Sequence, residues 1–294
     1  MEIIIGINPD SSDSDGMALG SLLARSLGAT PILAHIYPIN FDYPSMAHVD
    51  VEWVAYLQEQ AALLLEESKA RFCARFGWDD IEVAMAGHRS SGRGLAEMAQ
   101  ERGSSLIVIG SAPGTSLGRF GIGSTADKLL HDSPVPVATA PVGYAREGVQ
   151  QIGRLVVAFQ NTAESLATLI AGAEMAERAG LPVRVLTLLI RHRMYGSNLG
   201  ADAEEVVLRQ ILEDTVAAQR EALSEITITV PTDSVTPTGD SVRAAMERLD
   251  WEGDELLMLG SAAGGGLRRV FLGDMTYKLL RATPVPAVVM PRNT

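Results

Sequence analysis

A chain of 294 residues is long enough to form two domains of ordinary size, each with its own buried core. The net charge of −12 and the lack of any block of basic residues argue against nucleic acid or an anionic membrane as the main partner. No apolar run reaches about 18 residues, so we expect no transmembrane helix, and the first residues lack the basic segment of a signal peptide. The single cysteine, Cys73, excludes an intrachain disulfide, so we expect a protein of the reducing cytoplasm.

The first half of the chain alternates short apolar runs with longer helical stretches, which is typical of a parallel, doubly wound sheet. Gly103 predicts the C-terminal cap of the third helix. We expect strands at 2–7, 31–36, 81–86, 106–109 and 135–138, and helices at 16–27, 51–76, about 93–103 and 125–131.

The second half repeats this alternation after a linker at 142–153, with Gly180 as the predicted cap of its first helix. We expect strands at 155–159, 182–190, 227–230, 256–259 and 285–288, and helices at 161–179, 204–226, 241–249 and 275–281.

One segment occurs twice, at 106–141 and at 256–291. Gly110 corresponds to Gly260 and Pro141 to Pro291, with a constant offset of 150 residues (260 − 110). Such a fixed offset marks a duplicated unit, and because the period is the size of a domain it predicts two tandem domains.

Each copy of this segment joins a buried strand to a helix through a glycine-containing loop, which is a pattern suited to binding an anion. Glycines allow a ligand to approach the backbone, and the N–H groups at a helix start favour negative charge. Ser124 stands at that start and offers a hydroxyl donor to a phosphate. Ser124 and Asp127 also fit a capping box, which requires no ligand, and one hydroxyl can serve both roles. The second copy has Asp274 in the same place, and its carboxylate would repel a phosphate.

These residues resemble the universal stress protein family in its tandem two-domain form. ATP-binding members of that family carry Gly-x2-Gly-x9-Gly-Ser/Thr, and the first half reads Gly110-x3-Gly114-x8-Gly123-Ser124. Pro113 stands where the family has its second glycine, and the second half loses the Ser/Thr. The resemblance covers essentially the whole chain.

The resemblance implies an α/β fold of two tandem doubly wound domains, at 1–142 and 153–294. Each would have a five-stranded parallel sheet, in the order 3-2-1-4-5, with helices on both faces. It also implies an adenine nucleotide in the first domain, most simply ATP with or without Mg²⁺. The base would lie by Asn8 and Ile36, and the phosphates by the glycine loop and the helix start. The cofactor-binding residues expected in this way are Asn8, Ile36, Gly110, Ser111, Gly114, Gly123, Ser124 and Thr125.

Several features argue against an efficient enzyme. The run from Gly114 to Gly118 matches the G-x-S-x-G nucleophile pattern, but Ser116 lies several residues beyond the predicted strand end. No histidine shows metal-ligand spacing, so we expect no metal site and no catalytic residue, and only slow ATP hydrolysis stays open.

A second hypothesis is a nucleotide-free member of the family that acts through dimerisation or an unidentified regulatory partner protein. Prolines in the runs 135–138 and 285–288 predict sheet edges. Such edges can pair by strand addition, either between the two halves as an intrachain pseudo-dimer or in a homodimer.

Overall fold

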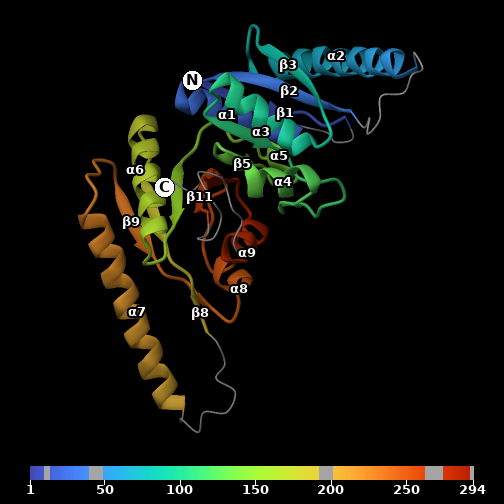
Figure 1. The fold of residues 1–294 in the computed structure, drawn as a ribbon. Helices are drawn as coiled ribbons and strands as arrows, with labels where there is room; N and C mark the ends of the chain where they lie inside the picture. Colours follow the sequence, from blue (N-terminus) through green and yellow to red (C-terminus); the bar gives the residue numbers. More distant parts are fainter. Residues whose placement is uncertain (10–13, 40–48, 192–200, 262–273, 292–294) are drawn as a thin grey trace.

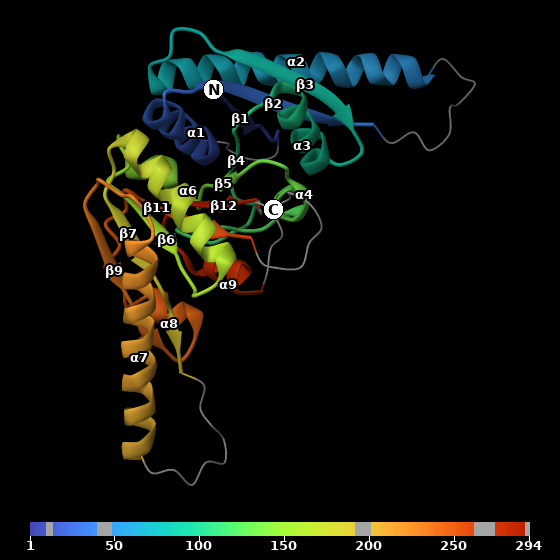
Figure 2. The ribbon, with the colours of Figure 1, turned by 60° about the vertical axis from the view of Figure 1, so that its left-hand side comes forward.

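The computed structural model describes residues 1–9, 14–39, 49–191, 201–261 and 274–291. Ten strands form one sheet in the order β3-β2-β1-β4-β5-β12-β11-β6-β7-β9. The long helices α2 (Val49–Phe76) and α7 (Ala201–Ser224) lie at opposite ends of the molecule in both Figures 1 and 2.

The first half contributes five parallel strands in the order third, second, first, fourth, fifth, which confirms the predicted doubly wound arrangement. All four residues of β4 are buried, as expected of a strand covered on both faces. The strands are β1 (Glu2–Gly6), β2 (Thr30–Pro38), β3 (Glu82–His88), β4 (Leu106–Ile109) and β5 (Val137–Thr139). The helices besides α2 are α1 (Ser14–Leu27), α3 (Ser91–Arg102), α4 (Ser124–Asp132) and α5 (Tyr144–Glu147).

The second half repeats the same strand order, and it adds a separate two-stranded sheet of β8 and β10. Its main strands are β6 (Arg154–Ala158), β7 (Val183–Leu186), β9 (Thr232–Val235), β11 (Glu255–Gly260) and β12 (Ala287–Met290). The short pair is β8 (Leu189–Ile190) and β10 (Thr238–Gly239). The helices besides α7 are α6 (Ala163–Ala179), α8 (Val242–Met246) and α9 (Asp274–Ala282).

The two halves join through an antiparallel pairing of β5 with β12. Val137 lies opposite Val289 and Ala138 opposite Val288, and the Thr139 hydroxyl donates a hydrogen bond to the Ala287 carbonyl. The predicted pairing between the two runs that contain proline therefore occurs within the chain. Pro136 and Pro286 lie just before these strands, where their carbonyls accept hydrogen bonds and no backbone N–H is needed.

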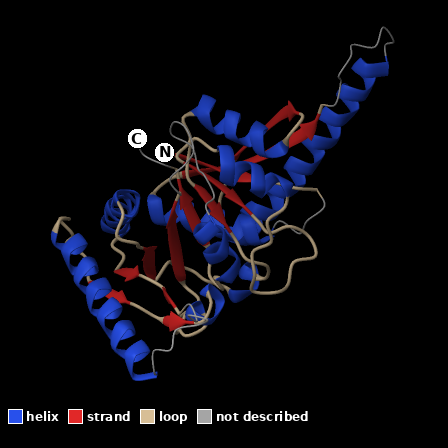
Figure 3. Ribbon diagram, turned by 60° about the horizontal axis from the view of Figure 1, so that its bottom comes forward, coloured by secondary structure: helices blue, strands red, loops and turns tan. Residues whose placement is uncertain are grey.

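Helices cover both faces of this sheet (Figures 2 and 3), and a hydrophobic core lies between the sheet and the helices on each face. Helices α1, α2 and α6 pack on one face, where Ile3 and Ile5 of β1 point. Helices α3, α4, α8 and α9 cover the other face, toward which Ile4 points. This alternation is what a strand between two helical layers requires.

Three predicted elements differ from the structure. The single strand expected at 182–190 is wrong, because the structure divides it into β7 of the main sheet and β8 of the separate sheet. The expected strand at 227–230 is wrong, because the strand that pairs with β7 is β9, after Pro231. Ile228 and Val230 alternate as in a strand because their side chains pack against the core. The expected linker contains α5, and the Asp15 carboxylate accepts hydrogen bonds from the N–H groups of Gly143 and Ala145.

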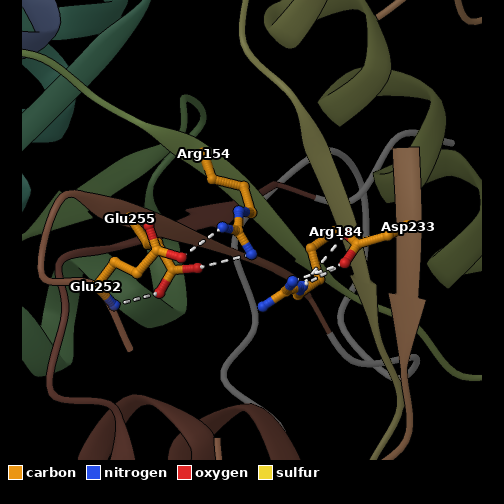
Figure 4. A network of polar contacts seen from close by, with 5 residues as sticks. All are labelled: Arg154, Arg184, Asp233, Glu252 and Glu255. Atoms are coloured by element: carbon orange, nitrogen blue, oxygen red, sulfur yellow. Dashed lines mark hydrogen bonds and ion pairs between the residues drawn. The ribbon is translucent and has the colours of Figure 1, made fainter. Parts of the chain in front are cut away.

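Charged side chains hold together the strands of the second half (Figure 4). Arg184 of β7 forms a bidentate contact with Asp233 of β9. Arg154 of β6 contacts Glu252 at 2.8 Å and Glu255 at 3.6 Å, and Glu255 also accepts the Glu252 N–H. Glu255 is 3% exposed, and burial raises the pKa of its carboxyl above the ordinary value.

Replacement of Val137 by Ala should destabilise both halves, because this side chain is fully buried at the junction. The loss of two methyl groups is expected to cost about 2 kcal/mol in the free energy of unfolding. Chemical denaturation would measure it, and Val207→Ala, an identical change at an exposed position, is the control. If Val137→Ala shifted the unfolding transition of one half alone, the stability of the two halves would not depend on this junction.

Replacement of Glu255 by Gln should change how stability depends on pH. A raised pKa in the folded state means that the folded protein holds this proton more tightly than the unfolded chain does. The stability that Glu255 contributes is therefore fully present below pH 4.5 and is lost as the pH rises through the raised pKa. Denaturation should show that the free energy of unfolding of Glu255→Gln, relative to that of the wild type, is higher at about pH 7 than at about pH 4. A constant difference would contradict the assignment.

Candidate functional site

A cleft of about 470 Å³ opens at the carboxyl ends of β1, β2 and β4. In a doubly wound sheet this is the point where the strand order reverses, and ligands bind there. The cleft brings together seven of the eight residues predicted to bind a cofactor, of which Gly114 is the exception. The seven are Asn8, Ile36, Gly110, Ser111, Gly123, Ser124 and Thr125.

The start of α4 forms one wall of this cleft. Gly123 is the N-cap residue, in extended conformation, and no side chain caps the helix. The predicted capping box of Ser124 and Asp127 is therefore wrong, because Ser124 is already the first helical residue and its side chain is exposed. The first intrahelical bond runs from the Asp127 N–H to the Gly123 carbonyl. The N–H groups of the three residues before Asp127 consequently have no partner within the helix, which leaves donors for an anion.

The Ser111 hydroxyl fixes the loop that precedes α4. It lies 3.0 Å from the Ala140 carbonyl and 3.2 Å from the Arg119 carbonyl, and it accepts the Gly121 N–H at 3.3 Å. The Ala112 N–H donates to the Gly121 carbonyl at 3.0 Å, so the loop folds back on itself. Ser111 thus lines the cleft while its hydroxyl is engaged in holding the loop.

Two glycines, Gly16 of α1 and Gly114 of the loop, allow the backbone conformation at this place. A Cβ atom on Gly16 would lie 2.9 Å from the Gly110 backbone nitrogen, so only glycine lets α1 approach the end of β4 this closely. Gly114 has φ of +77°, a conformation that side-chain-bearing residues rarely adopt, and it lies on the exposed turn outside the cleft. Its neighbours Ala112 and Pro113 line the cleft in its place.

The opposite end of the cleft is formed by Asn8 after β1 and by Ile36 of β2. The His35 ring donates through Nδ1 to the Ile7 carbonyl at 2.9 Å, so it fixes the backbone next to Asn8. This contact gives His35 a structural role at this end of the cleft. Sequence reasoning missed Ser91 at the start of α3 as a lining residue, although serines before a helix are a usual signal of a strand-to-helix turn.

The second half has a smaller cleft, of about 260 Å³, at the equivalent position. Thr276 fills space where the first half has Ala126, and its hydroxyl donates to the Gly260 carbonyl at 3.0 Å. Asp274 is the first residue of α9 and lines the cleft, and its carboxylate pairs with Lys278 at 2.6 Å. A carboxylate thus lies where the first half presents Ser124. Gly264 and Gly273 of the repeated motif lie outside the described residues.

Arg119 connects the loop of the first cleft to the second half. Its Nη1 donates to the carbonyl of Ala282, the last residue of α9, at 2.7 Å. The guanidinium also lies 3.6 Å from the Glu247 carboxylate after α8.

Within the part of the chain that the structure describes, no three His, Cys, Asp or Glu side chains gather as a metal site, and no helix there is long and apolar enough to cross a membrane.

Comparison with known proteins gives a consistent result. The sequence model of the Universal stress protein family matches residues 1–141 and again 151–291. A universal stress protein of Mycobacterium tuberculosis is 34% identical over 298 aligned positions, which cover 99% of this chain and 100% of the relative. A universal stress protein of Mycobacterium bovis matches at the same identity and coverage.

Solved structures show the same fold. The crystal structure of a universal stress protein from Archaeoglobus fulgidus superposes with a TM-score of 0.62, covering 99% of this chain and 98% of that one at 15% identity. A universal stress protein from Pseudomonas aeruginosa superposes with a TM-score of 0.58, covering 99% of this chain and 93% of that one at 17% identity.

The two serines of the first cleft should respond differently to replacement by alanine. Ser111→Ala removes a hydroxyl with three backbone partners and is expected to cost about 1–3 kcal/mol in the free energy of unfolding. Ser124→Ala removes an exposed hydroxyl that caps nothing, so its effect should stay within about 0.5 kcal/mol. Thermal and chemical denaturation of the two variants would test this. Equal losses would mean that the Ser124 hydroxyl also holds the fold.

Proposed function

The chain belongs to the universal stress protein family in its tandem two-domain form, and from this premise we propose that its first half is an adenine-nucleotide-binding regulatory module. The observation that carries the proposal is the uncapped start of α4, which faces a cleft at the switch point of the sheet. ATP is the nucleotide we propose, and the protein responds to stress through the nucleotide-bound state.

The phosphate end of the proposed site is the start of α4. Gly123 brings the backbone close to the ligand, and the N–H groups of Ser124, Thr125 and the following residue donate to phosphate oxygens. The Ser124 hydroxyl adds a further donor, because it is exposed and does not cap the helix. A Mg²⁺ ion, when present, would be held mainly by the phosphates, as is usual for this cation.

The base end of the proposed site lies between Asn8 and Ile36. The Asn8 side chain has both a donor and an acceptor, which suits the edge of an adenine ring. Ile36 offers an apolar surface and a backbone position near the carboxyl end of β2. The His35 contact to Ile7 keeps this end of the cleft in place before a ligand arrives.

A nucleotide-free function through partner proteins is the second candidate, and the second half favours it. Asp274 places a carboxylate at the helix start where a phosphate would bind, and the cleft there is smaller. Strand addition to a separate protein cannot use β5 or β12, however, because each of these strands already has a neighbour on both sides. A homodimer or partner would therefore use other surfaces, such as the edge strands β3 and β9. We propose a cytoplasmic location for the protein under either candidate function, because its single cysteine suits a reducing compartment.

Protein purified without added ligand should release adenine nucleotide on denaturation, at about one per chain if the site is tight. Mass spectrometry of the released small molecules would measure it, and calorimetric titration with ATP, with and without Mg²⁺, would give the affinity. A preparation free of nucleotide that also shows no heat with ATP would favour the second candidate.

Replacement of Ser124 by Asp should weaken nucleotide binding at least about tenfold, because a carboxylate would occupy the phosphate position. The variant should fold normally, since the second half carries Asp274 at the equivalent place. Ser124→Ala is the matched control and should lose much less affinity. If the wild type binds nucleotide and Ser124→Asp binds it equally tightly, the start of α4 is not part of the binding site.

A further inference from the structure

A third cavity, of about 360 Å³, lies among α1, the end of α2, α5 and the residues after α5. It shares no lining residue with the nucleotide cleft of the first half. Its volume falls within the range of small-molecule sites. The lining residues on which the argument rests are Ser21, Leu22, Arg25, Arg75, Val149 and Gln150.

Two arginines on this cavity are held in place by the backbone and by aromatic rings. Arg25 donates through Nη2 to the carbonyls of Phe76 and Gly77, and its guanidinium lies 5.1 Å from the centre of the Trp78 ring. Arg75 donates through Nη2 to the Ala145 carbonyl, and its guanidinium lies 5.5 Å from the Phe76 ring. Each guanidinium has five N–H donors, so most of them stay available to a ligand. Side chains fixed in this way lose little further freedom on binding.

The cavity presents two arginines in a strongly acidic protein, and the helices that line it also carry two carboxylates, Asp15 of α1 and Glu147 of α5. Acidic residues outnumber basic ones by 36 to 24 in the chain, yet none of the lining residues is acidic. Among the described residues, no carboxylate lies within ion-pair distance of Arg25 or Arg75. The neighbouring Asp15 carboxylate is engaged by the N–H groups of Gly143 and Ala145. The two arginines are exposed, and neither forms a direct ion pair within the part of the chain that the structure describes, so both charges can be offered to a ligand.

We propose that this cavity binds a small organic anion whose phosphate or carboxylate group lies against Arg25 and Arg75. Guanidinium groups match the planar and tetrahedral oxyanions of both classes. Leu22 and Val149 supply an apolar surface for the rest of the molecule, and Ser21 and Gln150 supply polar contacts. Because α5 and the residues after it lead into β6, the ligand would contact the segment that joins the two halves.

Titration with phenyl phosphate, benzoate and inorganic phosphate would test this site. Trp78 is a natural reporter, because its ring lies under Arg25 and its Nε1 donates to Ser21 of the cavity wall at 2.9 Å. We expect saturable binding, seen by calorimetry and by tryptophan fluorescence, with inorganic phosphate the weakest of the three. Preference between phenyl phosphate and benzoate identifies the natural anion as a phosphate or a carboxylate.

The double variant Arg25→Gln with Arg75→Gln should weaken this binding at least about tenfold. Arg220→Gln, the same change at an exposed position of α7, should bind as the wild type does. Gln150→Glu keeps the side-chain size and places a carboxylate beside the arginines, so it should weaken binding without removing their contacts to the backbone. This variant keeps the test decisive if the double variant folds poorly.

The Ser124→Asp variant distinguishes binding in this cavity from binding in the proposed nucleotide cleft, because the substitution lies in the cleft alone. Binding of the probes that survives Ser124→Asp and is lost in the arginine and Gln150→Glu variants would support the proposed anion site. Binding that is lost in Ser124→Asp but retained in the arginine variant would place the anion in the nucleotide cleft and overturn the proposal. Absence of saturable binding up to about 10 mM of each probe would also overturn it.

Discussion

The antiparallel pairing of β5 with β12 is the interaction on which the arrangement of this molecule depends. A doubly wound half-sheet ends in a strand with unpaired N–H and C=O groups, and an exposed edge of this kind invites association. Here each half supplies the missing neighbour of the other, so the ten strands become one sheet. Both faces of that sheet then carry a core with residues from both halves. The tandem chain thus forms within one molecule a contact that two separate copies would have to form by bimolecular association.

The same pairing determines where the two clefts lie. Within each half the main strands are parallel, whereas the halves are antiparallel to one another. The carboxyl ends of the two sets of strands are therefore at opposite edges of the common sheet. Since each cleft lies at the carboxyl ends of its own strands, the clefts open at opposite edges and could take different ligands without obstruction. Divergence of Ser124 and Asp274 between the copies is consistent with such a division.

The sequence predicted the fold well because the fold depends on local signals that repeat. Buried runs such as Leu106–Ile109 and caps such as Gly103 and Gly180 occur in both halves, and the structure confirms them. The strand at 227–230 was misplaced, because alternation identifies side chains that pack but not a backbone that pairs. The capping box at Ser124 was wrong by one residue, since a helix boundary depends on backbone angles that the side-chain pattern does not determine. The Arg25 and Arg75 pair was missed, because the two residues lie on different helices fifty positions apart (75 − 25).

Arg119 explains why the loop of the first cleft carries residues that binding a phosphate does not require. The loop is tied to the segment that follows β5 by the Gly118 N–H, which donates to the Val142 carbonyl, and by the Val142 N–H, which donates to the Arg119 carbonyl. From this position the Arg119 guanidinium reaches the last carbonyl of α9, where a positive charge also interacts favourably with the helix dipole. The first residue of α9 is Asp274, which lines the second cleft. One helix of the second half therefore contacts the loop of one cleft at its end and forms the wall of the other cleft at its start. The loop before α4 is consequently held in position by both halves, and the first cleft depends on the second domain for part of its support.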